Sequence, residues 1–312
     1  MATYHLEPSA DTLHGYFSPD LAPILTIDPG DSVIYKTLEA GWRIEPYTGG
    51  DYNAVPRHPS YGDEKGRGHA LVGPIAIRGA KAGMTLAVRI NAVIPSTWGN
   101  TLAGGWKNAV NARYGVEDRG IIHTWTMNTE TMTAVNQHGH TVALRPFMGV
   151  MGLPPPEAGR HPTSPPRVWG GNLDCKELIA GTTLYLPISV EGALFSTGDG
   201  HGVQGDGEVS ITAIECGMDR VDLTFDLRDD FPISVPHAHT QTGWLTMGFG
   251  ATLDDATYQA LEAMFALMQQ QQYQLERLDA IALASLTVDL HVTQIVNGVV
   301  GVHAILPHGA IR

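Results

Sequence analysis

The chain has 312 residues, including 36 glycines and 20 prolines, and its formal net charge at pH 7 is −13. This length can bury a large core in one large or two modest domains, and the glycine and proline content is typical of short strands joined by tight turns. The acidic balance, without any basic run, argues against a nucleic-acid or anionic-membrane partner. It fits a small neutral or cationic substrate, and it is also ordinary for a soluble cytosolic protein.

Only two cysteines are present, Cys175 and Cys216, so a disulfide framework is not indicated. The first residues contain no basic region followed by an apolar core, so no signal peptide is predicted. No apolar run approaches the length of a membrane span. Together these features predict a soluble cytoplasmic protein.

Residues 1–150 are predicted to form an N-terminal β domain, because short apolar or alternating runs recur between turn signals. The predicted strands lie at residues 13–17, 24–27, 32–38, 71–77, 84–94, 121–127, 132–135 and 141–144. The turn at residues 28–31 predicts a hairpin between the second and third of these strands. Residues 41–68 are expected to be a long loop. Residues 95–120 are expected to be a loop or a short helix.

Residues 151–250 are predicted to be a second β region that carries the most polar segment. Its proline-rich part, residues 154–166, cannot be a helix or a central strand, and we expect an ordered loop. The predicted strands lie at residues 182–190, 209–216, 220–227 and 241–249. Between the first two of these strands, residues 196–208 are predicted to form a glycine-rich polar loop.

Residues 251–312 are predicted to be a small α/β portion. A helix is predicted to begin at Asp254, because the apolar residues after it have helical spacing. A second helix is predicted at residues 275–286. Asn297-Gly298 is a strong hairpin signal between the predicted strands 287–296 and 299–306. Gln269 to Gln272 are placed at or just past the end of the first helix. The predicted fold class is therefore mainly β, with a sandwich- or barrel-like body of short strands and two helices plus a hairpin near the C-terminus.

The polar loop at residues 196–208 concentrates groups that can do chemistry. Glycine allows positive φ angles and close approach of a ligand. Asp199 and His201 are two residues apart, so in extended backbone their side chains point to one side. A carboxylate and an imidazole are ligands for zinc or a similar ion, and Glu208 could take a proton from a water activated there. The alternative is a glycine-rich turn whose acids cap backbone N–H groups.

Other candidates lie nearby in the sequence. Asn172 and Asp174 precede the predicted strand 182–190, on the other side of that strand from the polar loop, and suit a ligand or a plain turn equally. His69 follows a glycine-rich loop, and either it completes a site or it is a structural histidine. Cys175 is a candidate nucleophile of the kind found in nitrilase-like amidases, although buried and inert cysteines are more common.

Taken together and in order, the motifs resemble those of the acetamidase/formamidase family. They are His14–Phe17, Pro23–Asp31, Val72–Ile75, Pro146–Gly152, Gly170–Asp174, Gly181–Pro187, Gly198–Glu208 and Ala284–Asn297. The resemblance covers nearly the whole chain, from Leu13 to Leu306. It implies hydrolysis of a short aliphatic amide, such as formamide or acetamide, to the acid and ammonia. It also implies a mainly β fold, a metal-binding site and an oligomer.

The resemblance also implies roles for single residues. Asp174, Asp199 and His201 are the expected metal ligands, with zinc favoured and calcium or another divalent ion as the alternative. Asp199 and Glu208 are the expected catalytic residues, with Glu208 as the general base. Apart from the resemblance, the proposed attack by water needs groups that hold the amide, and the expected substrate-binding residues are Asn172, Gln204 and His69.

Two other functions are open at this point. One is covalent catalysis by Cys175, with Glu208 as its base. The other is a non-catalytic β-sandwich that binds a small ligand or carbohydrate and keeps a structural ion. For the favoured function, the expected partners are a small amide substrate and further copies of the chain in a homo-oligomer, with no nucleic acid and no membrane.

Overall fold

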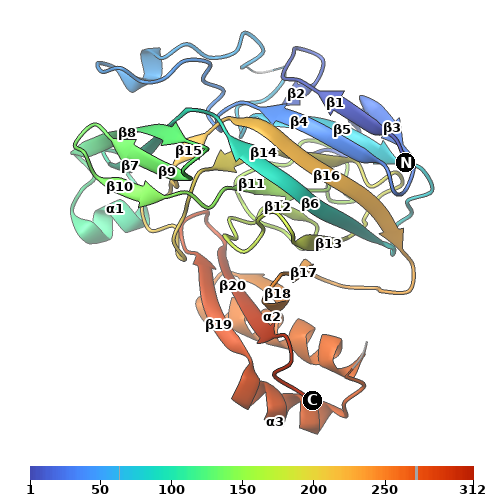
Figure 1. Ribbon diagram of the computed structural model, residues 1–312. Helices are drawn as coiled ribbons and strands as arrows, with labels where there is room; N and C mark the ends of the chain where they lie inside the picture. The colour runs from blue at the N-terminus through green and yellow to red at the C-terminus, as the bar shows by residue number, and fades with distance from the viewer. Residues whose placement is uncertain (63, 271–272) are drawn as a thin grey trace.

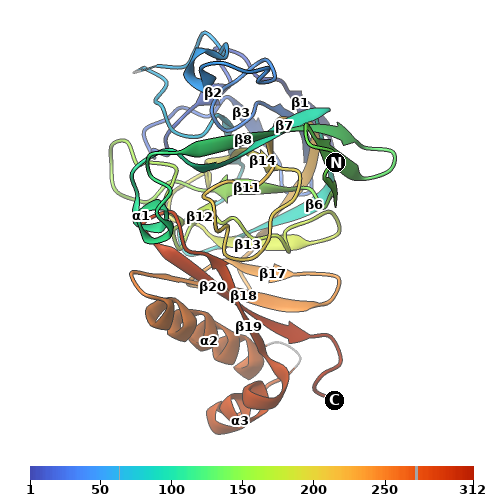
Figure 2. The ribbon, with the colours of Figure 1, turned by 90° about the vertical axis from the view of Figure 1, so that its left-hand side faces the viewer.

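The computed structural model describes residues 1–62, 64–270 and 273–312, and these residues form two large β-sheets with three α-helices (Figures 1 and 2). The prediction of a mainly β protein with a small helical portion near the C-terminus is confirmed. Both sheets are open in the described residues, so the body is a sandwich and not a closed barrel. No helix in these ranges is long and apolar enough to cross a membrane.

One sheet has nine strands and links the body to the C-terminal portion. In spatial order they are β1 (Thr3–Leu6), β4 (Ser32–Thr37), β16 (Met218–Arg228), β6 (Thr85–Pro95), β13 (Thr183–Pro187), β17 (His237–His239), β18 (Gly243–Gly250), β20 (Val300–Pro307) and β19 (Asp289–Gln294). Along β16, Val221, Leu223 and Phe225 are buried while Asp226 is exposed. This alternation is the period-2 pattern of a strand with one face on the core.

The other sheet carries the buried polar segment. Its main path is β10 (Thr141–Ala143), β9 (Thr133–Asn136), β8 (Gly120–Asn128), β7 (Trp98–Gly104), β15 (Glu215–Cys216), β14 (Phe195–His201), β11 (Phe147–Gly152) and β12 (Gly170–Asn172). Three further strands extend it beside β14: β5 (Leu71–Ile77), which pairs with β14, and β2 (Leu13–His14) and β3 (Leu25–Ile27), which pair with β5. Phe195 of β14 contacts Phe225 of β16 with ring centroids 5.0 Å apart, so the two sheets enclose one core.

Two helices cover the far end of the nine-stranded sheet, as Figure 2 shows. They are α2 (Leu253–Gln269) and α3 (Arg277–Thr287). The side chain of Thr252 caps α2 by accepting from the backbone N–H of Asp255. Apolar residues of α2, among them Met264 and Leu267, pack with residues of β20 in a second core. The predicted pair of helices and hairpin is therefore confirmed; of the predicted glutamines, Gln271 and Gln272 lie outside the described residues.

The hairpin predicted around residues 28–31 is wrong. β3 pairs in parallel with β5, whereas β4 pairs with β1 and β16 in the other sheet. The turn thus carries the chain from one sheet to the other. A turn signal predicts that the chain changes direction, but it does not predict which strand pairs with which. The pairing depends on which side chains of each strand are buried against the core.

The polar segment at residues 196–208 is not a simple loop. Its first half belongs to β14, a central strand, and only residues 202–208 are irregular. The strand predicted at residues 209–216 shrinks to β15, two residues long. Residues 95–120 contain β7 as well as the short helix α1 (Ala109–Tyr114), and β11 was not predicted. The predicted long loop is confirmed over residues 41–62 and 64–68, where the described part contains the 3-10 helix η1 (Tyr52–Ala54).

The division into residues 1–150, 151–250 and 251–312 stays a prediction. Strands from all three ranges lie in the nine-stranded sheet, where β13 pairs with β6 and with β17, and β18 pairs with β20. The C-terminal portion is joined to the body through this continuous sheet.

Candidate active site

Three neighbouring strands bring the predicted polar segments together. Asp199 and His201 lie at the end of β14, and Asn172 ends β12, two residues before Asp174. β11 lies between β12 and β14 and pairs with both. The predicted association of residues 172–174 with the polar segment is therefore observed, but across β11 rather than across β13.

His201 is the centre of the polar cluster. Its Nε2 lies 3.4 Å from Oδ1 of Asp199 and 3.4 Å from Oε2 of Glu215. The possible ligand atoms of these three residues lie within 4.8 Å of one another. A second group with the same property consists of Asp174, His201 and Glu208. The two groups share His201, and all five side chains are buried.

Gly149 of β11 makes room for this cluster. A Cβ added there would lie 2.6 Å from Oδ2 of Asp199, 2.9 Å from Oδ1 of Asp174 and 2.9 Å from Cε1 of His201. Real Cβ atoms do not approach other atoms so closely, so only glycine fits without moving the carboxylates. The cluster is therefore packed directly on the bare backbone of the strand.

Three of the acids have a backbone conformation that residues with a side chain seldom adopt. The φ angle is 47° at Asp174, 59° at Asp199 and 47° at Glu208. Such left-handed conformations cost on the order of 1 kcal/mol or more each, and they gather at functional sites because the surrounding structure imposes them. Here they bring acids from three segments to one centre.

The C-terminal hairpin reaches into the site. Asn297, in the turn between β19 and β20, donates its amide Nδ2 hydrogen to Oδ2 of Asp174 at 2.7 Å. Gln204 donates from Nε2 to the backbone oxygen of Asp174 at 2.8 Å. Gly207 forms a parallel bridge with Gln294 at the end of β19. The hairpin thus holds both Asp174 and the segment that carries Glu208.

Several buried polar atoms at the centre lack a hydrogen-bond partner among the described residues. They are Oδ1 of Asp174, Nδ1 of His201, Oε2 of Glu208, Oε2 of Glu215, Oδ1 of Asn172, Oε1 of Gln204 and Nδ1 of His69. Buried polar atoms are nearly always paired, because an unpaired one keeps the cost of its lost hydration. So many in one place indicate a site built for a polar ligand or a cation.

The charges of the cluster are divided between its members. Burial raises the pKa of Asp174 to about 8, and it raises the pKa of Glu215. Burial and the charge of Asp174 together raise the pKa of Glu208 well above its ordinary value. For Asp199, burial is outweighed by the positive charges of His69 and His201, which lower its pKa.

His201 behaves in the opposite way to an ordinary buried histidine. Burial lowers its pKa, but the charges of Glu215 and Asp199 outweigh burial, and the net pKa lies well above 6.5. The imidazolium of His201 thus lies within a cluster of four buried acids. A divalent cation would let more of these acids ionise, because an opposite charge nearby favours the charged form.

A cavity of about 260 Å³ opens onto the cluster. Its walls include His69 and Asn172, as predicted for substrate-binding residues, together with Asp199, Glu208 and Glu215. Gln204 does not line this cavity: it lines a neighbouring cavity of about 210 Å³, which Glu208 also lines, and donates to the backbone oxygen of Asp174. Its role in binding substrate stays a prediction.

Cys175 is a poor nucleophile here. Its side chain is fully buried, it does not line the cavity, and burial raises the pKa of its thiol far above the ordinary value. A thiolate is the reactive form of cysteine, so a buried thiol of high pKa is inert.

Sequence reasoning missed Glu215, Asn297 and Arg43 at this site. Glu215 was hidden inside an apolar run that was interpreted as a strand, where a lone acid was the one available signal. In the structure Glu215 pairs directly with His201 across β14 and β15. Asn297 was interpreted as a turn residue at the end of a family motif and not as part of the site, and Arg43 lay in a loop without a clear pattern.

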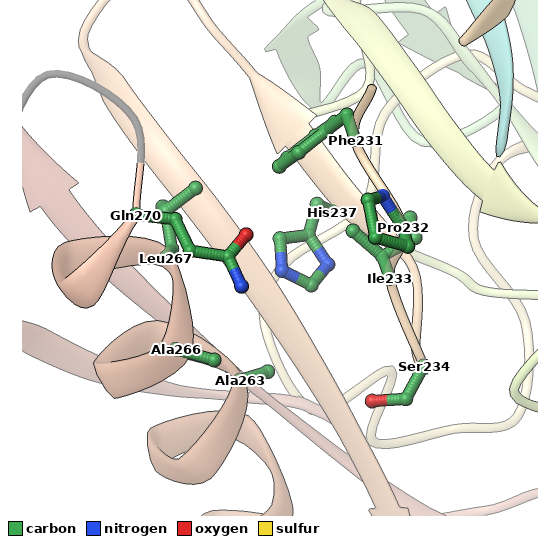
Figure 3. Close-up of a pocket in the computed structure, with 9 residues that line it drawn as sticks. All are labelled: Phe231, Pro232, Ile233, Ser234, His237, Ala263, Ala266, Leu267 and Gln270. Carbon is green, nitrogen blue, oxygen red and sulfur yellow. The ribbon is translucent and has the colours of Figure 1, made fainter. Parts of the chain in front are cut away.

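A further cavity of about 250 Å³ lies between α2 and residues 231–237 (Figure 3). Apolar side chains such as Phe231, Ile233 and Leu267 line it, and His237 is its one titratable residue. The His237 ring bonds the backbone oxygen of Val235 through Nδ1 at 2.8 Å. Burial lowers the pKa of His237 to about 4, so the ring is neutral near pH 7. The described lining of this cavity contains no acid that could pair with His237.

The fold and the buried centre define a β-sandwich protein with a carboxylate–histidine site set on glycine-rich strands. The chain belongs to the Acetamidase/Formamidase family, whose sequence model matches residues 3–161 and 156–308. This membership confirms the resemblance inferred from the motifs.

Two individual relatives share less than a third of their aligned residues with this chain. A provisionally named formamidase of Schizosaccharomyces pombe is 29% identical over 256 residues, and the formamidase of Methylophilus methylotrophus is 27% identical over 252 residues. Each match covers 64% of this chain and 60% of the relative, so the chain spans about 60% of the length of these curated relatives. The structure of an acetamidase from Bacillus halodurans is similar with a TM-score of 0.82 at 27% identity, covering 97% of each chain.

The neutral state of His237 predicts a pH effect on stability. Its pKa of about 4 in the folded protein lies below the 6.5 of an unfolded chain, so the unfolded state binds the proton first as pH falls. The stability from the neutral ring is fully present above pH 6.5 and is lost towards pH 4. We expect wild type to lose about 3 kcal/mol more than His237→Gln over this interval. Urea unfolding at each pH measures the difference, and His5→Gln, at an exposed position, is the control. Parallel curves for wild type and His237→Gln would contradict the assignment.

Proposed function

We propose that this chain hydrolyses a short aliphatic amide, of the formamide or acetamide kind, to a carboxylic acid and ammonia. The observation that carries the proposal is the buried cluster around His201, which opens on a cavity and contains unpartnered ligand atoms. Membership of the Acetamidase/Formamidase family supports the same activity. The names of the relatives as formamidase and acetamidase agree with it.

The donor set suits a divalent cation. Asp199, His201 and Glu215 form one group of converging ligand atoms, and Asp174 converges on His201 in the second group, where the neighbouring Glu208 is kept as the base. Mixed carboxylate and imidazole ligands favour zinc, while a site richer in carboxylate oxygens would take calcium or another hard ion. When bound, such an ion would lower the pKa of a water molecule and polarise the amide carbonyl.

Glu208 is the proposed general base. It lines the cavity, its Oε2 has no hydrogen-bond partner within the described residues, and its pKa is raised, which makes its carboxylate a stronger proton acceptor. Glu208 would accept a proton from the attacking water and return it to the leaving nitrogen. Asn172 and His69 line the same cavity and would hold the amide group.

Replacing Glu208 by glutamine tests the base. Glu208→Gln keeps the size of the side chain but cannot accept the proton, so we expect kcat for ammonia release to fall by about 10²–10⁴. Cys175→Ser is the matched control, because a thiol nucleophile would lose its activity while the proposed mechanism keeps it. Circular dichroism checks that both variants fold. Full activity of Glu208→Gln, or loss of activity in Cys175→Ser, would contradict the proposal.

Metal content tests the cation site. Purified protein should hold a divalent ion, and exhaustive chelation should remove both the ion and the ammonia release, with recovery on adding zinc or another divalent ion. Gly149→Ala should lose the ion as well, since its Cβ would displace Asp199, Asp174 and His201. Elemental analysis gives the ion and its stoichiometry. Undiminished turnover in metal-free protein would exclude a catalytic ion.

A homo-oligomer also remains part of the proposal. The C-terminal portion exposes apolar side chains, including Leu278 and Leu286 of α3, which are 81% and 80% exposed, and Leu290 on the edge strand β19. A second copy of the chain would cover them. Light scattering after size exclusion should give a mass above that of one chain, and Leu286→Glu should lower it. A monomer at micromolar concentration would be the contrary result.

A further inference from the structure

Arg43 lies in the wall of the same cavity as the carboxylate–histidine centre. Arg43 is only 6% exposed, and it lines the cavity together with Asp199, Glu208 and Glu215. Arginine is seldom buried unless it is paired, because taking a guanidinium out of water is costly. The contacts of this side chain therefore show what it is placed to bind.

The guanidinium is fixed on one face and incompletely paired at its edge. Its Cζ lies 3.6 Å from the centre of the Tyr52 ring, so the ring covers one face of the plane. Nη1 contacts Oε1 of Glu39 at 3.4 Å, and Nε has no hydrogen-bond partner among the described residues. Stacking on Tyr52 covers a face of the guanidinium plane and leaves its edge uncovered. The N–H groups point outward from that edge, so they can still donate hydrogen bonds.

The backbone makes a specific place for this side chain. A Cβ at Gly41 would collide with Nη1 of Arg43, and it would lie 3.1 and 3.2 Å from the carboxylate oxygens of Glu39. Only a glycine lets the pair lie against the chain here. The loop thus leaves room for the guanidinium at this position.

Glu39 neutralises Arg43 only in part. Burial is the main cause that raises the pKa of Glu39 to about 7, while Arg43 lowers it. A carboxyl group that is half protonated near neutral pH is a weak counter-ion. The 3.4 Å separation is also long for a charge-assisted hydrogen bond, which is normally about 2.7–2.9 Å.

The cavity is larger than a simple amide needs. Its volume of about 260 Å³ approaches the roughly 300 Å³ lower limit of sites for drug-sized molecules, whereas acetamide has only four heavy atoms. Space therefore remains for a longer acyl chain between the reacting amide and Arg43. A carboxylate is the group that a guanidinium fork binds best, through two parallel hydrogen bonds.

We propose, on the basis of the amide hydrolysis inferred above, that the substrate is a short amide whose acyl chain ends in a carboxylate, and that Arg43 binds this carboxylate. The substrate class is thus the monoamide of a small dicarboxylic acid. The net charge of −13 opposes an anionic substrate at long range, but salt screens that repulsion while a buried contact is screened little. Arg43 supplies the local attraction that selects the anion.

Two amides of equal size test the proposal. Succinamate ends in a carboxylate, and 4-oxopentanamide replaces that group with a neutral methyl ketone of the same number of heavy atoms. We expect kcat/KM of wild type to be at least about tenfold higher for succinamate. In Arg43→Met this ratio should fall by about 10- to 100-fold, since hydrogen bonds to charged groups contribute that much. Arg43→Lys should keep part of the preference, because it retains the charge without the fork.

Two variants control the measurement. Arg43→Met leaves the Glu39 carboxylate buried without its cation, and this could prevent folding. In that case the double variant Glu39→Gln/Arg43→Met, which has neither charge, is used for the same measurement. Arg78→Met removes an exposed arginine that pairs with Asp28 at 2.7 Å and lies outside the cavity wall. The ratio for Arg78→Met should equal that of wild type.

The outcomes separate this inference from the proposed function. Hydrolysis of acetamide and 4-oxopentanamide without a preference for succinamate would overturn the inference and leave the amidase proposal standing. An equal loss for both amides in Arg43→Met would also overturn it, because Arg43 would then act on the reaction centre in general. No ammonia from any amide, in protein supplied with divalent metal, would overturn the amidase proposal and this inference with it.

Discussion

The structure depends on burying four carboxylates around one imidazole. Such a cluster is unfavourable by itself, because each charge loses hydration and the acids repel one another. The protein tolerates it by packing the acids against backbone without side chains, at Gly149 of β11, and by forcing Asp174, Asp199 and Glu208 into left-handed conformations. The glycine-rich sequence is therefore a condition for the cluster, and the two sheets provide the rigid support that strained residues require.

The C-terminal portion completes this arrangement. Its helices lie at the end of the nine-stranded sheet (Figure 1). Its hairpin brings Asn297 onto Asp174 and Gln294 beside Gly207. The hairpin therefore contributes contacts to the cluster in addition to pairing within the sheet. It restrains two of the acids whose positions the cluster needs, while the long loop with Arg43 forms another wall of the cavity.

The sequence predicted the local features and missed most of the long-range ones. The strands with clear alternation, the two helices and the Asn297-Gly298 hairpin follow from periodicity and turn chemistry, which are local. Asp174, Asp199, His201 and Glu208 were found because glycine spacing made them conspicuous. Glu215 and Asn297 join the cluster through strand pairing and hairpin docking, and no local pattern reports those contacts. The turn at residues 28–31 failed for the same reason, since its flanking strands have partners in different sheets.

The contact between Asn297 and Asp174 has a consequence for synthesis of the protein. The two residues are 123 positions apart, so the cluster cannot reach its final form until the chain has been made well past the second β region. Until then the buried acids lack one of their restraints, and the strands that carry them have an incomplete sheet beside them. A nascent chain would therefore pass through a stage in which its body is largely made but its carboxylate–histidine cluster is still open, and the cluster would close only when the last hairpin arrives.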